Sequence, residues 1–290
     1  MFTSTVSRAK GVTSRAATHV SRITAVSPQL IIRAAIIVMV LLPLIPLLIW
    51  SFSHRWYFPT LLPTEWSLRA WSYIFSANSK VLTALGNSLL VAAAVTVISL
   101  VVGLPAGRVM GLYQFRGKTV VWFLLLAPTI VPVLAVAMGI HIAFIRYGLA
   151  DTLLGVILVH LVPVLPYMVL ILAGVFANFD TDYEAQACTL GANTYQMFYH
   201  VTLPMILPGM VVGALFAFII SWSQYILTLL IGGGRVITLP VLLFSFANSG
   251  DNAVTAALSI VFVAPAILFL LLTTRYLTGR DTAVGSIGNF

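Results

Sequence analysis

The sequence predicts an all-α, polytopic membrane protein with six transmembrane helices. Of its 290 residues, 60% are hydrophobic and only 8% are charged, whereas soluble domains carry roughly 25% charged residues. The mean hydropathy is correspondingly high, at +1.06. The apolar residues also gather in six runs, each long enough to cross roughly 30 Å of hydrocarbon, which takes about 20 residues. Lipid must therefore be the solvent of most of the chain.

The six expected spans lie near residues 31–52, 84–106, 119–142, 152–175, 205–231 and 253–274. The first run is interpreted as an anchor rather than a cleaved signal peptide, because it is long and no small-residue cleavage site follows it. We expect a six-span domain over residues 29–277 and a short tail over residues 278–290. Residues 1–28 are too polar to fold alone and are expected to be flexible. The alternative for this tail is an amphipathic helix lying on anionic lipid.

The distribution of basic residues predicts the orientation of the chain in the membrane. Ten of the 15 lysines and arginines fall on one side of the six spans: Arg8, Lys10, Arg15, Arg22, Arg33, Arg108, Arg116, Lys118, Arg275 and Arg280. The other five are Arg55, Arg69, Lys80, Arg146 and Arg235. The positive-inside rule then places both termini in the cytoplasm. Because these charges are not gathered on one soluble face, the net charge of +8 does not indicate nucleic-acid binding.

One segment on the predicted cytoplasmic side has acids and no lysine or arginine. It follows the fourth expected span and reads FDTDYEAQACTLGANTYQMFYHVTLP over residues 179–204. Thr181 and Glu184 have the spacing of a capping box, which predicts the start of a short helix. Gly191 can adopt the left-handed conformation that closes a helix, and Asn193 or Thr194 can cap a second one. The segment is therefore expected to be a helix, a glycine turn and a second helix.

The same segment resembles the cytoplasmic signature of the permease subunits of binding-protein-dependent ATP-binding cassette importers. That signature is EAA, three residues, G, nine residues and I-x-LP. Ala187, Gly191, Val201, Leu203 and Pro204 fall on its spacing. Ala185 stands at the position of the signature glutamate, and Glu184 precedes it by one residue. The resemblance implies a type I importer fold in which a cytoplasmic coupling loop, residues 178–204, docks in a groove of an ATPase. It assigns ATPase coupling to Glu184, Ala185, Ala187, Gly191, Ala192, Leu203 and Pro204.

Further phrases extend the resemblance over about residues 85–245. They are Asn87-Ser88-Leu89, RGK at 116–118, Ala127-Pro128, GLADTLLG at 148–155, TLGAN at 189–193, SWSQY at 221–225 and Thr238-Leu239-Pro240. Together they look most like the spermidine/putrescine branch and its relatives for phosphonate, iron, thiamine or sulfate. Sugar permeases more often carry an acid just before the signature glycine, where this chain has Leu190. A sugar-type permease is the alternative within the family.

Polar residues at membrane depth are candidates for a solute pathway, because unsatisfied polar atoms are costly there. Ser221, Trp222, Ser223, Gln224 and Tyr225 lie within the fifth expected span, and His141 and His160 lie in or near the third and fourth. For these residues the alternative role is packing with hydrogen bonds between helices. Gly209 and Gly213 form a G-x-x-x-G pair, for which close helix packing is the expected role.

The sequence offers no chemistry of its own. It has no nucleotide-binding motif, and its one cysteine and five histidines lack metal-site spacing. We therefore expect a non-catalytic subunit without cofactor or metal, in a bacterial inner membrane. The resemblance implies four partner subunits: a second homologous permease, two copies of a cytoplasmic ATPase that bind ATP and Mg²⁺, and an external solute-binding protein.

Two rival classes remain. A stand-alone six-span membrane enzyme would need a catalytic cluster at a membrane face. A secondary transporter should show membrane-buried acids or inverted repeats.

Overall fold

The computed structural model describes residues 32, 35, 36, 38, 39, 42–56, 59, 60 and 62–278. The chain forms two compact units, residues 1–46 and residues 47–290. The expected amino-terminal tail, part of the first expected span and nearly all of the expected carboxyl-terminal tail lie outside the described residues.

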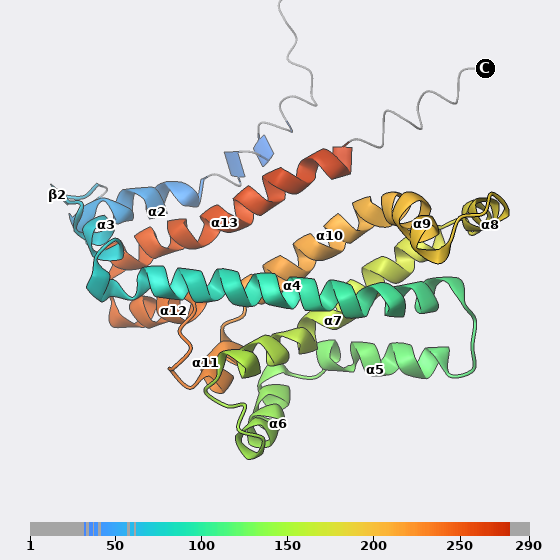
Figure 1. Ribbon diagram of the computed structural model, residues 1–290. Coiled ribbons are helices and arrows are strands. Elements are labelled where there is room, and N and C mark those ends of the chain that lie inside the picture. Colours follow the sequence, from blue (N-terminus) through green and yellow to red (C-terminus); the bar gives the residue numbers. More distant parts are fainter. Residues whose placement is uncertain are drawn as a thin grey trace, which may run out of the picture. The chain divides into compact units, whose positions relative to one another are not determined.

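The described residues are predominantly helical, which agrees with the predicted all-α class. Figure 1 labels the elements: α2 (Leu44–Ser51), β1 (Ser53–Arg55), β2 (Glu65–Trp66), α3 (Arg69–Ile74), the 3-10 helix η1 (Ala77–Ser79), α4 (Val81–Leu112), α5 (Lys118–Ile130), α6 (Val133–Arg146), α7 (Leu153–Ala177), α8 (Asp182–Thr189), α9 (Thr194–Met197), the π-helix η2 (Phe198–Thr202), α10 (Leu203–Trp222), α11 (Ile226–Gly232), α12 (Leu239–Ser249) and α13 (Asn252–Thr278). The strands β1 and β2 pair antiparallel, Ser53 opposite Trp66 and Arg55 opposite Glu65.

Within the described residues, four helical segments are long and apolar enough to cross a membrane. They are α4, α7, the segment Thr194–Trp222 that ends with α10, and Asn252–Thr273 of α13. The bent pair α5 and α6 makes five if it is one span. The first expected span, near residues 31–52, includes residues that the structure does not describe and is not among these candidates, so the count of six stays a prediction.

The third expected span, residues 119–142, is not one straight helix. The helices α5 and α6 meet at an angle of 101°. The break lies at Pro132, which has no N–H to donate into a continuing helix. The residue before a proline is pushed out of the helical region, and Val131 is extended, with φ −76° and ψ 140°. The carbonyl of Pro132 accepts hydrogen bonds from the backbone of Ala135 and Val136, which starts α6.

The helix α7 is the centre of the bundle and packs mainly against α4 and α10. In its most apolar stretch 61% of the residues are buried, against 22–33% in the other candidate spans. On α4, glycines recur every fourth residue at Gly103, Gly107 and Gly111. A Cβ built on each would lie 2.5–2.7 Å from Met168, Leu172 and Phe176 of α7 or from the α7 backbone. The two backbones therefore approach each other at a distance that only glycine permits.

The pair Gly209 and Gly213 on α10 faces α7 from another side. A Cβ on Gly209 would lie 2.2 Å from Val175, and one on Gly213 would lie 2.9 Å from the sulfur of Met168. The expected packing role of this pair is confirmed. Small residues on α4 and α10 thus allow both helices to pack closely against α7. Such close packing is needed in lipid because burial of apolar surface does not drive helices together there.

The glycine contact predicts a sharp difference between two positions of one helix. Gly107→Ala should destabilise the protein by about 1–3 kcal/mol, because its Cβ overlaps Leu172 and lies 3.1 Å from the backbone nitrogen of Ala173. Gly86→Ala is the control, since a Cβ there meets nothing within 4 Å. The measurement is thermal unfolding of both variants in detergent. Equal midpoints for the two would contradict the close approach of α4 and α7.

Candidate functional site

The expected helix, glycine turn and helix is present between α7 and α10. We call residues 182–197, which hold α8, the turn and α9, the elbow. Gly191 has φ +85°. Its N–H donates to the carbonyl of Cys188, and the N–H of Ala192 donates to the carbonyl of Ala187, both at 3.0 Å. This is the Schellman pattern, in which the left-handed residue closes the helix and two carbonyls that would otherwise be unpaired are satisfied.

The second helix of the elbow begins at a capping box. The side chain of Asn193 accepts from the backbone N–H of Gln196, and the side chain of Gln196 accepts from the backbone N–H of Asn193. Of the two caps that the sequence left open, Asn193 is therefore the one used. The chain continues through the π-helical turn η2 into α10, where Leu203 is partly buried and Pro204 is exposed.

The capping box expected for Thr181 and Glu184 is wrong. The side chain of Thr181 makes no capping hydrogen bond at the start of α8. Instead, Asp180 accepts from the backbone N–H of Asp182. Glu184 points away from the helix end and into the protein, where it is only 8% exposed. A carboxylate is stabilised more by a charged partner than by a backbone N–H at a helix end, because a hydrogen bond between charged groups is about twice as strong as a neutral one.

The partner of Glu184 is Arg108, in the last turns of α4. The guanidinium donates Nη1 to Oε1 at 2.8 Å and Nη2 to Oε2 at 2.6 Å. The hydroxyl of Thr202 donates to Oε1 at 2.5 Å. The guanidinium carbon lies 5.6 Å from the ring centroid of Phe176, at the end of α7. We call Arg108, Glu184 and Thr202 the Arg108 cluster. It brings α4, α8 and the start of α10 together beside α7.

The charge state of this cluster follows from its hydrogen bonds. The bonds from Arg108 lower the pKa of Glu184, burial opposes them by raising it, and the bond from Thr202 lowers it further. The pKa of Glu184 in the folded protein therefore lies below its ordinary value. The stabilisation by the ion pair is fully present when the pH is above that ordinary value. It is lost only as the pH falls through the lowered one. Near neutral pH the cluster is therefore an intact ion pair.

Sequence reasoning missed Arg108 and Thr202 as partners of Glu184. Arg108 was counted only as one of the basic residues that orient the chain. A signal existed: Arg108, just past the second expected span, and an acidic segment with no lysine or arginine were predicted on the same side of the membrane.

Apart from the exposed carboxylate of Asp182, the remaining surface of the elbow is uncharged and rich in large side chains. Ala185, at the position of the signature glutamate, is exposed, whereas Ala187 and Ala192 are partly buried. Tyr183, Leu190 and Tyr195 are 50%, 88% and 79% exposed. Such exposed apolar groups are typical of a surface that meets another protein.

The fifth expected span, residues 205–231, is interrupted where the polar residues lie. The helix α10 ends at Trp222, and α11 begins at Ile226. The hydroxyl of Ser223 donates to the carbonyls of Ile219 at 2.9 Å and Ile220 at 3.3 Å, which competes with continuation of the helix. Ser223 is exposed, and Gln224 and Tyr225 are partly exposed. Irregular backbone at membrane depth is tolerated where it is buried in protein or lines a water-filled cavity.

On the inner side of the same break the polar groups satisfy one another. His160 of α7 is 1% exposed, and its nitrogens lie 2.9 Å from the hydroxyl of Ser221 and 2.8 Å from that of Thr228. Trp222 is 2% exposed, stacks on Phe218 and Phe262, and donates its indole N–H to the carbonyl of Phe262. His160, Ser221 and Trp222 are thus buried and hydrogen-bonded between helices, as the alternative packing role predicts.

The seventh pathway candidate, His141, lies on α6, away from the polar contacts at the break. It is partly exposed, and its Nδ1 atom is buried without a hydrogen-bond partner among the described residues. The structure therefore brings Ser223, Gln224 and Tyr225 to the accessible side of the break and does not join His141 to them.

Two phrases that are distant in the sequence meet beside this break. Asn87 of α4 donates its amide to the carbonyl of Ile237 at 3.0 Å, and the backbone N–H of Leu239 donates to the hydroxyl of Ser88 at 2.7 Å. Ser88 and Thr238 line a small void together with His160, Ser221 and Gln224. The helix α4 is thus hydrogen-bonded to the segment that leads from α11 into α12.

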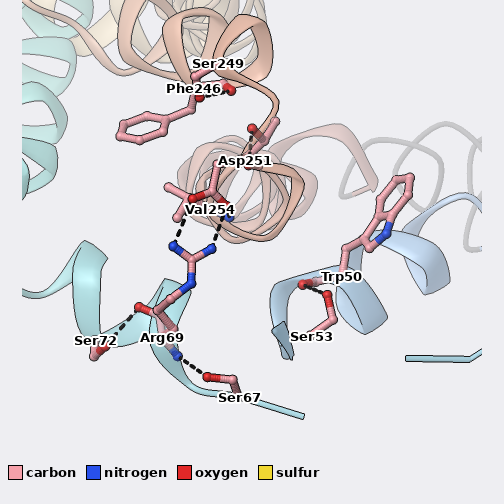
Figure 2. A network of polar contacts seen from close by, with 10 residues as sticks. Trp50, Ser53, Ser67, Arg69, Ser72, Phe246, Ser249, Asp251 and Val254 are labelled. Carbon is pink, nitrogen blue, oxygen red and sulfur yellow. Dashed lines mark hydrogen bonds and ion pairs between the residues drawn. The ribbon is translucent and has the colours of Figure 1, made fainter. Parts of the chain in front are cut away.

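A second ion pair lies at the other end of α4, near its first residue. Arg69 of α3 donates to both carboxylate oxygens of Asp251, at 2.8 and 3.0 Å, and Asp251 also accepts from the backbone N–H of Val254 at the start of α13 (Figure 2). Although burial raises the pKa of Asp251, the bonds from Arg69 and Val254 lower it below its ordinary value. A hollow of about 390 Å³ beside this pair is lined by Trp50, His54 and Trp56 as well.

No group of three or more metal-ligating side chains occurs among the residues that the structure describes. Residues 100–280 match the family described as binding-protein-dependent transport system inner membrane component.

Two relatives and one solved structure show the range of similar proteins. The molybdenum transport system permease protein ModB of Mycobacterium tuberculosis is 32% identical over 74% of this chain and 86% of its own length. The putrescine transport system permease protein PotI of Escherichia coli is 27% identical over 75% of this chain and 79% of its own. The structure is a bacterial ABC transporter involved in the import of the acidic polysaccharide alginate. It has a TM-score of 0.67 at 17% identity and covers 86% of this chain and 95% of the other.

Proposed function

Since this chain belongs to the family of binding-protein-dependent transport system inner membrane components, we propose that its elbow is where an ATPase drives the movement of solute through it. The chain is a permease subunit of a type I ATP-binding cassette importer and a multi-pass inner membrane protein. In the proposal it performs no covalent chemistry. The ATPase is a separate cytoplasmic subunit that binds ATP and Mg²⁺. A second permease, two ATPase copies and an external solute-binding protein complete the importer.

The observation that carries this proposal is the form of the elbow. It is a rigid turn, closed by a Schellman motif and a capping box, and its outer surface presents Tyr183, Leu190 and Tyr195. Its one acid other than Glu184, Asp182, is exposed, and residues 176–204 contain no lysine or arginine. An apolar, weakly acidic surface complements a groove that is apolar at its centre and basic at its rim. With Ala185 at the signature glutamate position, this contact does not depend on a salt bridge from that residue.

For the solute pathway we propose the accessible side of the α10–α11 break. Ser223, Gln224 and Tyr225 offer neutral hydrogen-bonding groups, and the described spans α4–α7 and α10–α13 contain no Asp or Glu. These residues fit best a small polar solute that is recognised without a charged side chain from this chain. For a putrescine-like, cationic solute, the carboxylates that pair with it would have to come from the second permease. The relatives differ in the solutes that they are named for, so they do not decide this point.

The proposed orientation has both termini and the elbow in the cytoplasm. Reporter domains fused after residues 115 and 195 should report the cytoplasm, and fusions near residues 148 and 248 should report the outside. The reason is that in this orientation α4, the bent pair α5 and α6 taken as one span, α7, α10 and α13 each cross the membrane. The measurement is the activity of a compartment-sensitive reporter. A cytoplasmic signal from the fusion near 248 would contradict this topology.

The coupling role of the elbow is tested at Gly191. Gly191→Val should uncouple or detach the ATPase, because a side chain at φ +85° costs about 1 kcal/mol or more and β-branched residues fare worst. Gly191→Asn is the matched control, since asparagine tolerates this conformation and a Cβ there meets nothing within 4 Å. The measurements are uptake and co-purification of the ATPase. Normal uptake by Gly191→Val at normal expression would remove the coupling role.

The pathway role is tested at Gln224. Gln224→Leu should impair uptake or change solute preference while the complex still assembles, because the substitution removes hydrogen-bonding groups from a partly exposed position inside the membrane. Gln224→Asn keeps an amide and should retain more activity. Uptake kinetics with varied solute concentration, together with the yield of intact complex, are the measurements. Unchanged kinetics for Gln224→Leu would assign this residue to packing.

A further inference from the structure

The Arg108 cluster holds the elbow to a helix that is far away in the sequence. Both oxygens of Glu184 are used: Oε1 accepts from Arg108 and Thr202, and Oε2 accepts from Arg108. Arg108 and Glu184 are 76 residues apart. The helix α8 packs chiefly against α9 and η2, so this side-chain contact is what ties it to α4. Figure 1 shows α8 and α9 at the same end of the bundle as the carboxyl end of α4.

The burial of the cluster makes it a firm contact rather than a surface ion pair. The side chains of Glu184 and Arg108 are only 10% and 29% exposed. Exposed ion pairs hold their partners weakly, whereas separating a buried pair leaves an uncompensated charge, which is strongly unfavourable. Any movement of α8 therefore either carries Arg108 with it or separates this pair.

The helix α4 is able to carry such a movement to the middle of the membrane. It runs unbroken from Val81 to Leu112 and packs on α7 through its glycines. Its residues Asn87 and Ser88, which bond Ile237 and Leu239, lie about 20 residues before Arg108. At 1.5 Å per residue this separation is about 30 Å, the thickness of the hydrocarbon layer.

We propose that Arg108, Glu184 and Thr202 are positioning residues that make α4 follow the elbow, so that movement of the elbow reaches the segment 237–239 beside the α10–α11 break. This inference rests on the proposed function, because it takes the elbow to be the contact with the ATPase. In this arrangement the elbow moves two helices: α10, which continues from it along the chain, and α4, which the ion pair holds.

The test uses the assembled importer in lipid vesicles, with solute uptake and ATP hydrolysis measured on the same preparation. Glu184→Gln and Thr202→Val remove the charge and the hydroxyl of the cluster. The ATPase should still co-purify, while the number of solute molecules moved per ATP should fall by about fivefold or more, the lower end of ordinary couplings between two sites. Thr202→Ser keeps the hydroxyl and should restore the ratio.

Asp251→Asn is a matched control. It weakens the other bidentate ion pair of the described chain, which does not contact the elbow. It should leave the ratio of transport to hydrolysis unchanged even if it lowers thermal stability. A second readout is hydrogen exchange of the backbone amides at 237–239. Adding nucleotide should change their exchange in the unmodified importer, and this response should be lost in Glu184→Gln.

The possible outcomes separate this inference from the proposed function. If Gly191→Val uncouples the importer and Glu184→Gln keeps a normal ratio and a normal exchange response, the elbow couples but α4 does not follow it, and the inference is overturned. It is also overturned if Glu184→Gln simply releases the ATPase, because the cluster would then act in docking. Normal transport by Gly191→Val together with normal transport by Glu184→Gln would overturn both.

Discussion

The close approach of α4 and α10 to α7 is the contact on which the rest of the bundle depends. In lipid, apolar side chains gain nothing by leaving their solvent, so helices associate through van der Waals contact at short range. Glycines on α4 and α10 provide that range, and the large side chains of α7, such as Met168 and Leu172, fill the space that the missing side chains leave. In this position, His160 of α7 contacts Ser221 at the α10–α11 break, and Phe176 of α7 contacts Arg108 of the Arg108 cluster.

Two interruptions of the backbone follow different rules. At Val131 and Pro132 a proline turns the chain by 101°, and the carbonyl of Pro132 accepts hydrogen bonds from the first turn of the next helix. At residues 223–225 the helix ends although no proline is present there, because the hydroxyl of Ser223 bonds the preceding carbonyls and Thr228 bonds the carbonyl of Gln224. Both breaks obey one requirement: backbone groups at membrane depth must find partners inside the protein. Only the second break gathers polar side chains, which is why it is the better candidate for a pathway.

Charge is confined to the ends of the described bundle, and there it joins separate elements. Arg69 and Asp251 connect α3 to the start of α13 near the first residue of α4, while Arg108 and Glu184 connect α4 to α8 near its last. Each pair is bidentate, which fixes the angle between the joined elements as well as their distance. The helix α4 thus has an ion pair near each end and the hydrogen bonds of Asn87 and Ser88 between them. A continuous helix bonded in this way suits the transfer of movement from one face to the other.

Short stretches of the sequence were enough to predict the class of fold, the form of the elbow and the family. These features depend on local composition, on helix caps and on a left-handed glycine at 191, all of which can be seen in a short stretch of chain. The tertiary structure alone decided that Glu184 bonds Arg108 instead of capping α8, and that Trp222 packs in the core while Gln224 stays accessible. The physical reason is that the contacts of a side chain depend on which groups the fold brings close to it and on how deeply it is buried. For Glu184, the ion pair with Arg108, 76 residues away, is more favourable than the local helix cap that its spacing from Thr181 suggested.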